Sequence, residues 1–182
     1  MSRYVITSLL LLGLAPVCRG QSAPEETRTF IGWFTASSHL GAATLLVDST
    51  SFGVMNEEME KVIRDSADFS REERQEIRKE VAEPAFHIWD TSLTGPLRIL
   101  PSDSLKAVFK RHHSRDGWEA FYQRYGKQYC TFSAPIFLRK YTLCIFYAGQ
   151  SCGWLCGGGM LAVYRKVDGQ WQYWKNFGSW ES

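Results

Sequence analysis

The sequence predicts an α+β fold in which helices from the first two-thirds of the chain pack on a C-terminal antiparallel β-meander. Two observations predict this class. Charged segments with apolar residues at helical spacing occupy residues 55–82, and aromatic and β-branched runs separated by glycines dominate residues 129–177. We expect residues 21–182 to form a single domain, because about 160 residues suffice for one hydrophobic core.

Residues 1–20 have the layout of a secretory signal peptide. Arg3 gives a basic start, an apolar run follows, and small residues precede the expected cleavage after Gly20. We therefore expect an exported protein, periplasmic or extracellular. Lipid attachment at Cys18 is not expected, because Val17 stands where a lipoprotein signal usually has a small residue. No other segment has the ~20 apolar residues of a transmembrane helix.

The charge balance of the chain does not favour a nucleic-acid partner. The whole chain has a net charge of +2, with 21 basic and 19 acidic residues. Removal of Arg3 and Arg19 with the signal leaves equal numbers of the two. Nucleic-acid-binding proteins carry a clustered basic excess, and none is left here.

The first third of the domain is predicted to contain a loose start, a helix and a short strand. Residues 21–27 are polar, and we expect a loose start there. Helical spacing of apolar residues begins near Thr29 and includes Phe30 and Trp33. The aliphatic run of residues 43–48 predicts a buried strand.

Residues 55–82 predict two helices. Met55, Met59, Val62 and Ile63 form an apolar stripe in the first helix. Ser70-Arg-Glu-Glu73 is a capping box that begins the second helix, which should end before Pro84 and lie on the surface.

Shorter elements follow. Residues 85–89 predict a short strand, and residues 94–104 predict a loop because they contain glycine and prolines. A helix is predicted over residues 104–111. Trp118, Phe121, Tyr122 and Tyr125 form an aromatic helix face that ends at Gly126.

The rest of the chain predicts strands near residues 129–135, 142–150, 159–166 and 171–177. Asp168-Gly169 predicts a tight hairpin between the last two. Aromatic residues on these strands are explained by packing, although a carbohydrate- or peptide-binding face would have the same pattern.

Cysteine spacing predicts one disulfide at the tip of the preceding hairpin. Cys144 and Cys152 lie on one extended segment, about 26 Å apart, too far for a disulfide. Cys144 is similarly remote from Cys156, so the strands favour Cys152–Cys156. The neighbouring glycines, Gly153 and Gly157–Gly159, are expected to supply left-handed backbone angles.

Cys130 and Cys144 are expected to be free core thiols, although a tighter turn between their strands would align them. A redox site is disfavoured because Cys152 and Cys156 have a Cys-x-x-x-Cys spacing and a strand follows. A zinc site is disfavoured because only two of these cysteines are close in sequence. No metal or cofactor is therefore expected.

Trp154 and Leu155 at the tip allow two interpretations. They fold back onto the sheet or a helix, as most large apolar side chains do. Alternatively, they form a rigid, exposed anchor for a partner, and these two residues are then the candidate binding site.

The sequence contains no recognisable catalytic set. His87 and Asp90 could form an acid–base pair but are better explained as a polar loop edge. His112 and His113 diverge if helical. The glycines at 157–159 could bind an anion, but lack a following helix and are expected to form a hairpin turn.

The segment from Gly117 to the C-terminus resembles an uncharacterised family of exported bacterial proteins. The matching features are Trp118 with Phe121-Tyr122, Ser133, Cys144-Ile-Phe-Tyr147, Cys152-Gly-Trp-Leu-Cys-Gly157, Lys166, Gly169-Gln-Trp171 and Trp180-Glu-Ser182, and Leu45–Thr50 is similar to a shorter feature of that family. The resemblance implies the exported β-meander and assigns no activity. The signal segment, the disulfide-closed tip and the absence of a catalytic set lead us to expect a non-enzymatic exported domain that binds a protein or glycan of the envelope or extracellular space. The alternative is a hydrolase-type enzyme whose active site is assembled from dispersed residues.

Overall fold

The structure, a computed structural model, describes residues 22–53, 55–111 and 114–182. The predicted signal peptide and the His112-His113 pair lie outside these residues. The fold is α+β, as predicted, with most helices in the N-terminal part and the long strands in the C-terminal part.

Within the described residues one sheet has seven strands, in the order β2-β1-β3-β5-β6-β7, with β4 paired to β5 beside β3. Their bounds are β1 Leu45–Val47, β2 Arg98–Leu100, β3 Tyr129–Phe132, β4 Ile136–Leu138, β5 Leu143–Gly153, β6 Cys156–Val167 and β7 Gln170–Glu181. β3 to β7 are antiparallel, as predicted, whereas β1 runs parallel to both β2 and β3. The sheet is therefore mixed, and β2 corrects the prediction that residues 94–104 are all loop.

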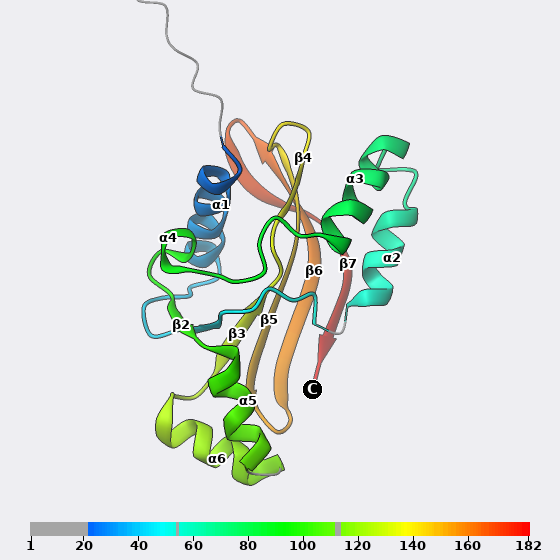
Figure 1. The fold of residues 1–182 in the computed structure, drawn as a ribbon. Helices are drawn as coiled ribbons and strands as arrows, with labels where there is room; N and C mark the ends of the chain where they lie inside the picture. Colours follow the sequence, from blue (N-terminus) through cyan, green and yellow to red (C-terminus); the bar gives the residue numbers. More distant parts are fainter. Residues whose placement is uncertain (1–21, 54, 112–113) are drawn as a thin grey trace, which may run out of the picture.

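Helices cover both faces of this sheet (Figure 1). They are α1 Ala23–Ser37, α2 Asn56–Arg64, α3 Arg71–Ala82, α4 Thr91–Thr94, α5 Ser102–Arg111 and α6 Ser114–Arg124. α1 and α4 stand on one side of the strands, α2 and α3 on the other, and α5 and α6 lie beside the tip of the β5–β6 hairpin (Figure 1).

α1 begins earlier than the sequence suggested. The prediction of a loose start over residues 21–27 is wrong from residue 23 onward. Pro24, Glu25 and Glu26 lie in the first turn of the helix. Proline suits this position because its missing N–H would have no partner there, and acidic residues favour the positive end of the helix dipole. Phe30, Ile31 and Phe34 then face the sheet and are buried.

Two local predictions between α2 and α5 had different outcomes. The capping box at α3 is confirmed: Glu73 N donates to Ser70 Oγ at 3.2 Å, and Ser70 N donates to Glu73 Oε2 at 2.8 Å. The strand predicted over residues 85–89 is reduced to one isolated bridge between Ile88 and Ser49. No neighbouring strand extends that bridge into a ladder.

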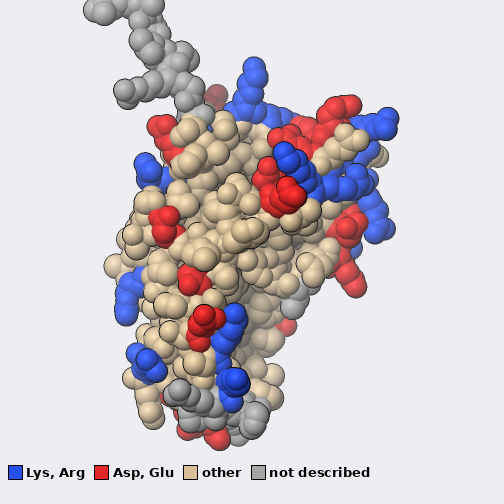
Figure 2. All heavy atoms as spheres, viewed as in Figure 1, with Lys and Arg blue, Asp and Glu red and all other residues tan. Residues whose placement is uncertain are grey.

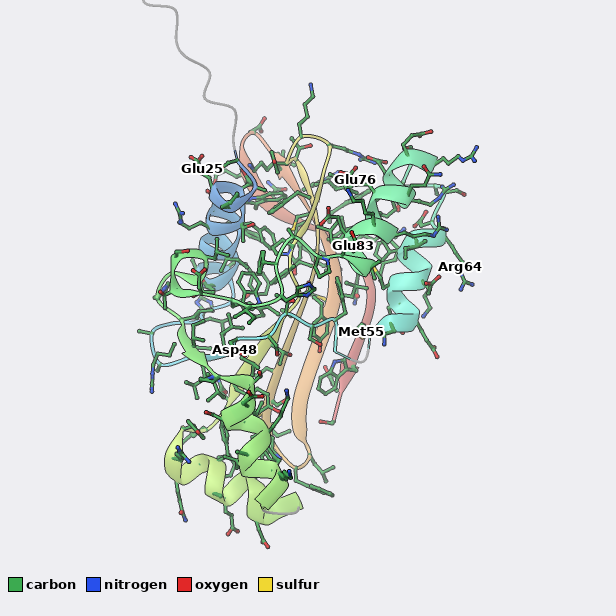
Figure 3. All side chains as sticks on the ribbon, in the orientation of Figure 1. Glu25, Asp48, Met55, Arg64, Glu76 and Glu83 are labelled. Carbon is green, nitrogen blue, oxygen red and sulfur yellow. A yellow bond between two sulfur atoms is a disulfide. The ribbon has the colours of Figure 1, made fainter. Side chains whose placement is uncertain are left out.

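The parts of β5 and β6 far from the tip, such as Leu143–Tyr147 and Leu161–Tyr164, are buried on both faces, which explains their continuous apolar sequence. On β5, Cys144 and Phe146 belong to the core beneath α1, whereas the alternate residues Ile145 and Tyr147 belong to the core beneath α2 and α3. Met55 lies between the start of α2 and the strands, and Arg64 at its other end points away (Figure 3). The hairpin at Asp168-Gly169 is confirmed, with φ of 50° and 78° at the two residues.

Three ion pairs, made by two basic residues, join the α2–α3 unit to the sheet, in a region where charged side chains gather on the surface (Figure 2). Lys175 of β7 contacts Asp65 at 2.8 Å and also contacts Asp68, both in the connection between the helices. Arg139, in the β4–β5 turn, contacts Glu73 of α3 at 2.7 Å. These contacts attach the two helices to the middle of β7 and to the β4–β5 turn.

We expect these ion pairs to make the fold weaker in acid. The hydrogen bond from Lys175 holds the pKa of Asp65 below its ordinary value of 3.8. The unfolded chain therefore binds this proton at higher pH than the folded chain, and the stabilisation is present above the ordinary pKa and lost as pH falls through the lowered one. The melting temperature should fall from about pH 5 downward.

Asp65→Asn is the matched variant for this effect, because its amide oxygen can still accept the N–H groups of Ala67 and Asp68 that Asp65 now accepts. Its melting temperature should depend less steeply on pH below about pH 5 than that of the wild type. Equal slopes in the two proteins would contradict the role of this carboxylate.

Candidate functional site

The tip of the β5–β6 hairpin is a two-residue turn closed by a disulfide. Gly153 pairs with Cys156, which leaves Trp154 and Leu155 as the turn residues. Cys152 and Cys156 are bonded, as predicted, with their Cα atoms 5.0 Å apart. The bond bridges a register shift in β5 between Ser151 and Gly153, so the ladder and the disulfide together hold the turn.

The glycines near the tip have a different function from the one predicted. None of Gly153, Gly157, Gly158 and Gly159 lies in the left-handed region, and the last three belong to β6 and not to a turn. They are needed for close approach: a Cβ on Gly159 would lie 2.5 Å from the Trp180 Nε1 atom. On this face Trp180 lies against the glycines and donates a hydrogen bond to the Tyr147 hydroxyl at 3.1 Å.

Trp154 and Leu155 are exposed, with relative accessibilities of 54% and 76%. The interpretation that they fold back onto the sheet or a helix is therefore wrong. Tyr122 of α6 stands beside them, 41% exposed, and its hydroxyl donates to the Cys152 carbonyl oxygen at 2.8 Å. This contact joins α6 to the tip.

The sequence did not reveal Tyr122 as part of this site. Its spacing predicts that it packs on the aromatic face of its helix, where Trp118 and Phe121 are indeed buried. Its partner Cys152 lies 30 residues away in the chain, so no local pattern signals the contact.

Cys130 and Cys144 are buried free thiols, as predicted. Burial raises the pKa of the Cys130 thiol to about 11. Burial, and then the negative charge of Glu26, raise the pKa of Cys144 as well. Both thiols are therefore protonated near neutral pH and unsuited to nucleophilic chemistry.

Alkylation should distinguish the two cysteine pairs. In protein isolated from an oxidising compartment and unfolded without reductant, iodoacetamide should modify Cys130 and Cys144 but not Cys152 or Cys156. After prior reduction, iodoacetamide should also modify Cys152 and Cys156, and peptide mass spectrometry identifies the modified cysteines. In Cys152→Ser, Cys156 should become reactive without reductant. Wild-type protein already alkylated at both tip cysteines would contradict the disulfide.

A groove lies on the other face of the same strands, the face that carries α1. Its volume is about 690 Å³, and it is bounded by the C-terminal half of α1 and by residues of β3, β5, β6 and β7. A smaller hollow of about 460 Å³ lies beside the disulfide and shares Gln150, Gly158 and Glu181 with it. The groove therefore extends toward the tip.

The candidate acid–base pair of the sequence, His87 and Asp90, does not assemble around these hollows. His87 is exposed and lines neither of them. Asp90 is the N-cap of α4: its Oδ1 accepts the Ser92 N–H at 2.7 Å and also contacts the Ser92 hydroxyl, and these hydrogen bonds lower the pKa of its carboxyl. The polar-loop interpretation of this pair therefore fits the structure.

No group of three or more His, Cys, Asp or Glu side chains in the described part of the chain is placed to hold a metal ion. Among the described helices, none has both the length and the apolar composition for a membrane span.

The chain matches no known protein family, no curated protein and no solved structure. The resemblance to exported bacterial proteins therefore stays a prediction.

Proposed function

We propose that this protein is a non-enzymatic, exported binding domain that inserts its hairpin tip into an apolar pocket of a partner protein in the envelope or extracellular space. The carrying observation is the exposure of two adjacent large apolar side chains, Trp154 and Leu155, on a turn closed by a disulfide. Leaving such side chains in water costs free energy, and aromatic residues are the commonest binding anchors.

The rigidity of the tip supports this proposal. The Cys152–Cys156 bond, the ladder between β5 and β6, and the Tyr122 hydroxyl all restrict the turn before any partner arrives. Ordering a flexible loop on binding would cost about 0.5–1.5 kcal/mol for each immobilised side chain. A restrained tip avoids much of that cost.

Export is part of the proposal and has two supports. The first is the signal-like composition of residues 1–20. The second is the disulfide, which is compatible with an oxidising compartment, because structural disulfides are rare in reducing ones.

The hydrolase alternative has less support. It would need a base and a nucleophile positioned in one cavity. Asp90 is engaged in capping α4, Cys156 is held in the disulfide, and the thiols of Cys130 and Cys144 are protonated. No observation on the described residues favours a particular reaction.

Trp154→Ala is expected to weaken partner binding by about 2 kcal/mol or more, roughly thirtyfold, because it removes the anchor. The partner is first isolated from envelope extracts of the source organism by a photoreactive side chain placed at position 155. Its dissociation constant is then measured with purified proteins by calorimetry.

Ile88→Ala is the matched control, since Ile88 is also exposed, at 65%, but lies away from the tip. It should bind as the wild type does. Equal affinity of Trp154→Ala and wild type for every partner captured at position 155 would overturn the proposal.

A further inference from the structure

The groove exists because α1 is shorter than the strands it covers. α1 has 15 residues and β6 has 12, so the helix is about 22 Å long and the strand about 40 Å. α1 packs over Tyr164 and Trp171, and the strands continue beyond its end toward the tip (Figure 1). The uncovered half of the sheet is the floor of the groove.

One side of the groove is aromatic. The Trp33 and Tyr164 rings meet edge to face with centroids 5.6 Å apart, and the Tyr173 ring meets Tyr164 at 6.2 Å. Tyr173 is 53% exposed, so a ring face is available to a ligand. Ala148, Gly158 and Met160 form a floor with short or unbranched side chains, which lets a ligand approach the strands.

Beyond Tyr173, the edge of the groove along β7 carries polar side chains, of which one is a carboxylate. Asn176, Ser179 and Glu181 follow one another along the edge strand β7, and all three are exposed. The Asn176 Oδ1 atom accepts the Gly178 N–H at 2.7 Å, which directs the amide group and leaves its two hydrogens as donors. On the floor, Gln150 Nε2 donates to Gln128 Oε1 at 2.9 Å, which orients a second amide.

These features select a chemical class. Among the described residues no Lys or Arg lines the groove, and its one charged residue is Glu181. Phosphate, sulfate and carboxylate groups would find no cation, and would approach a carboxylate. A bare hydrocarbon chain would leave the amides and hydroxyls of the polar edge without partners. A neutral ligand with apolar ring faces and many hydroxyl groups satisfies both the aromatic and the polar groups.

We propose that this groove binds a short neutral oligosaccharide, with a sugar face stacked on Tyr173 and its hydroxyl groups bonded to the polar edge of β7 and to Gln150. The volume of about 690 Å³ falls within the range of about 300–1,000 Å³ typical of small-molecule sites. This site adjoins the tip but is lined by neither Trp154 nor Leu155, and it does not depend on the protein partner proposed above.

Methionine methyl resonances test this proposal directly. Met160 lies in the groove, whereas Met55 and Met59 lie in the core on the other face of the sheet. The full chain, labelled with ¹³C at methionine methyl groups, is titrated with chitotriose, maltotriose, cellotriose and xylotriose. At least one should shift the Met160 signal saturably and leave those of Met55 and Met59 unchanged.

Two further probes address the competing ligand classes, namely trigalacturonate for acidic sugars and dodecanoate for acyl chains. Both should leave Met160 unchanged. A saturable Met160 shift with either of these and with none of the neutral sugars would overturn the proposal, and so would the absence of a shift with every neutral sugar.

Variants then locate the contact. Tyr173→Ala should weaken the sugar that binds by about tenfold, because it removes the stacking ring, whereas Tyr173→Phe should retain most of the affinity. Tyr122→Ala, a matched change at the tip, and Trp154→Ala should bind the sugar as the wild type does. Equal affinity of Tyr173→Ala and wild type would overturn the stacking arrangement.

Discussion

Glu26→Ala should lower the free energy of unfolding by about 3–5 kcal/mol, although it removes only one side chain from the first turn of a helix. Glu26 is fully buried, and its Oε1 atom accepts from Lys166 Nζ at 2.7 Å and from Trp171 Nε1 at 3.2 Å. The variant leaves the Lys166 ammonium, only 13% exposed, without its counter-charge. It also leaves the Trp171 N–H without an acceptor, which adds to the cost.

Urea denaturation measures this effect, with Glu25→Ala as the control, because Glu25 is adjacent, exposed and points away from the sheet (Figure 3). The control should change stability by less than about 0.5 kcal/mol. A loss below about 1 kcal/mol for Glu26→Ala would show that the pair contributes little.

The double variant Glu26→Leu with Lys166→Met tests whether the loss of stability comes from the unpaired Lys166 charge or from the loss of the ion pair itself. Replacing both charges of a buried pair with apolar side chains is often neutral or stabilising, since neither charge must then be kept out of water. We expect the double variant to be within about 1 kcal/mol of the wild type. That recovery would assign the loss in Glu26→Ala to the unpaired lysine.

Phe30→Ala should destabilise the protein by a similar amount, about 3–5 kcal/mol, for a different reason. Phe30 is fully buried in the core beneath α1, and its ring contacts those of Phe146, Trp171 and Tyr164 with centroids 5.1, 5.2 and 5.4 Å away. Removing the ring leaves a cavity among aromatic side chains that cannot collapse without moving the helix.

Phe30→Leu is the matched variant, because it retains most of the volume and should cost about 1–1.5 kcal/mol. Urea denaturation with an unchanged m-value would attribute both losses to the folded state. A Phe30→Ala protein no less stable than Phe30→Leu would mean that the core refills the cavity.

These two residues show how far the sequence could predict the fold. Phe30 was recognised from helical spacing, because its burial follows from the period of its own helix. Glu26 was assigned to a loose polar start, and its burial depends on Lys166, 140 residues later, at the far end of β6. No local pattern distinguishes such a carboxylate from its exposed neighbour Glu25.

The same distinction applies to the strands. The Asp168-Gly169 hairpin and the capping box at Ser70 depend on a few consecutive residues, and both were predicted correctly. β2 was missed because its three residues lie between prolines and pair in parallel with β1, more than fifty residues earlier. Short parallel strands gain their hydrogen bonds only from remote partners.

By itself, the sequence determined the fold class, the two closing hairpins and the pairing of Cys152 with Cys156. These follow from turn chemistry, alternation and the short reach of a disulfide, all of which act within a few residues. The tertiary structure alone decided that Trp154 and Leu155 are exposed and that a groove adjoins them. Both depend on where separate elements end: α6 places Tyr122 against the tip, and α1 stops before it covers the sheet. The sequence sets the length of each helix and strand. Whether a side chain or a sheet face is covered, however, depends on which distant segments pack against it.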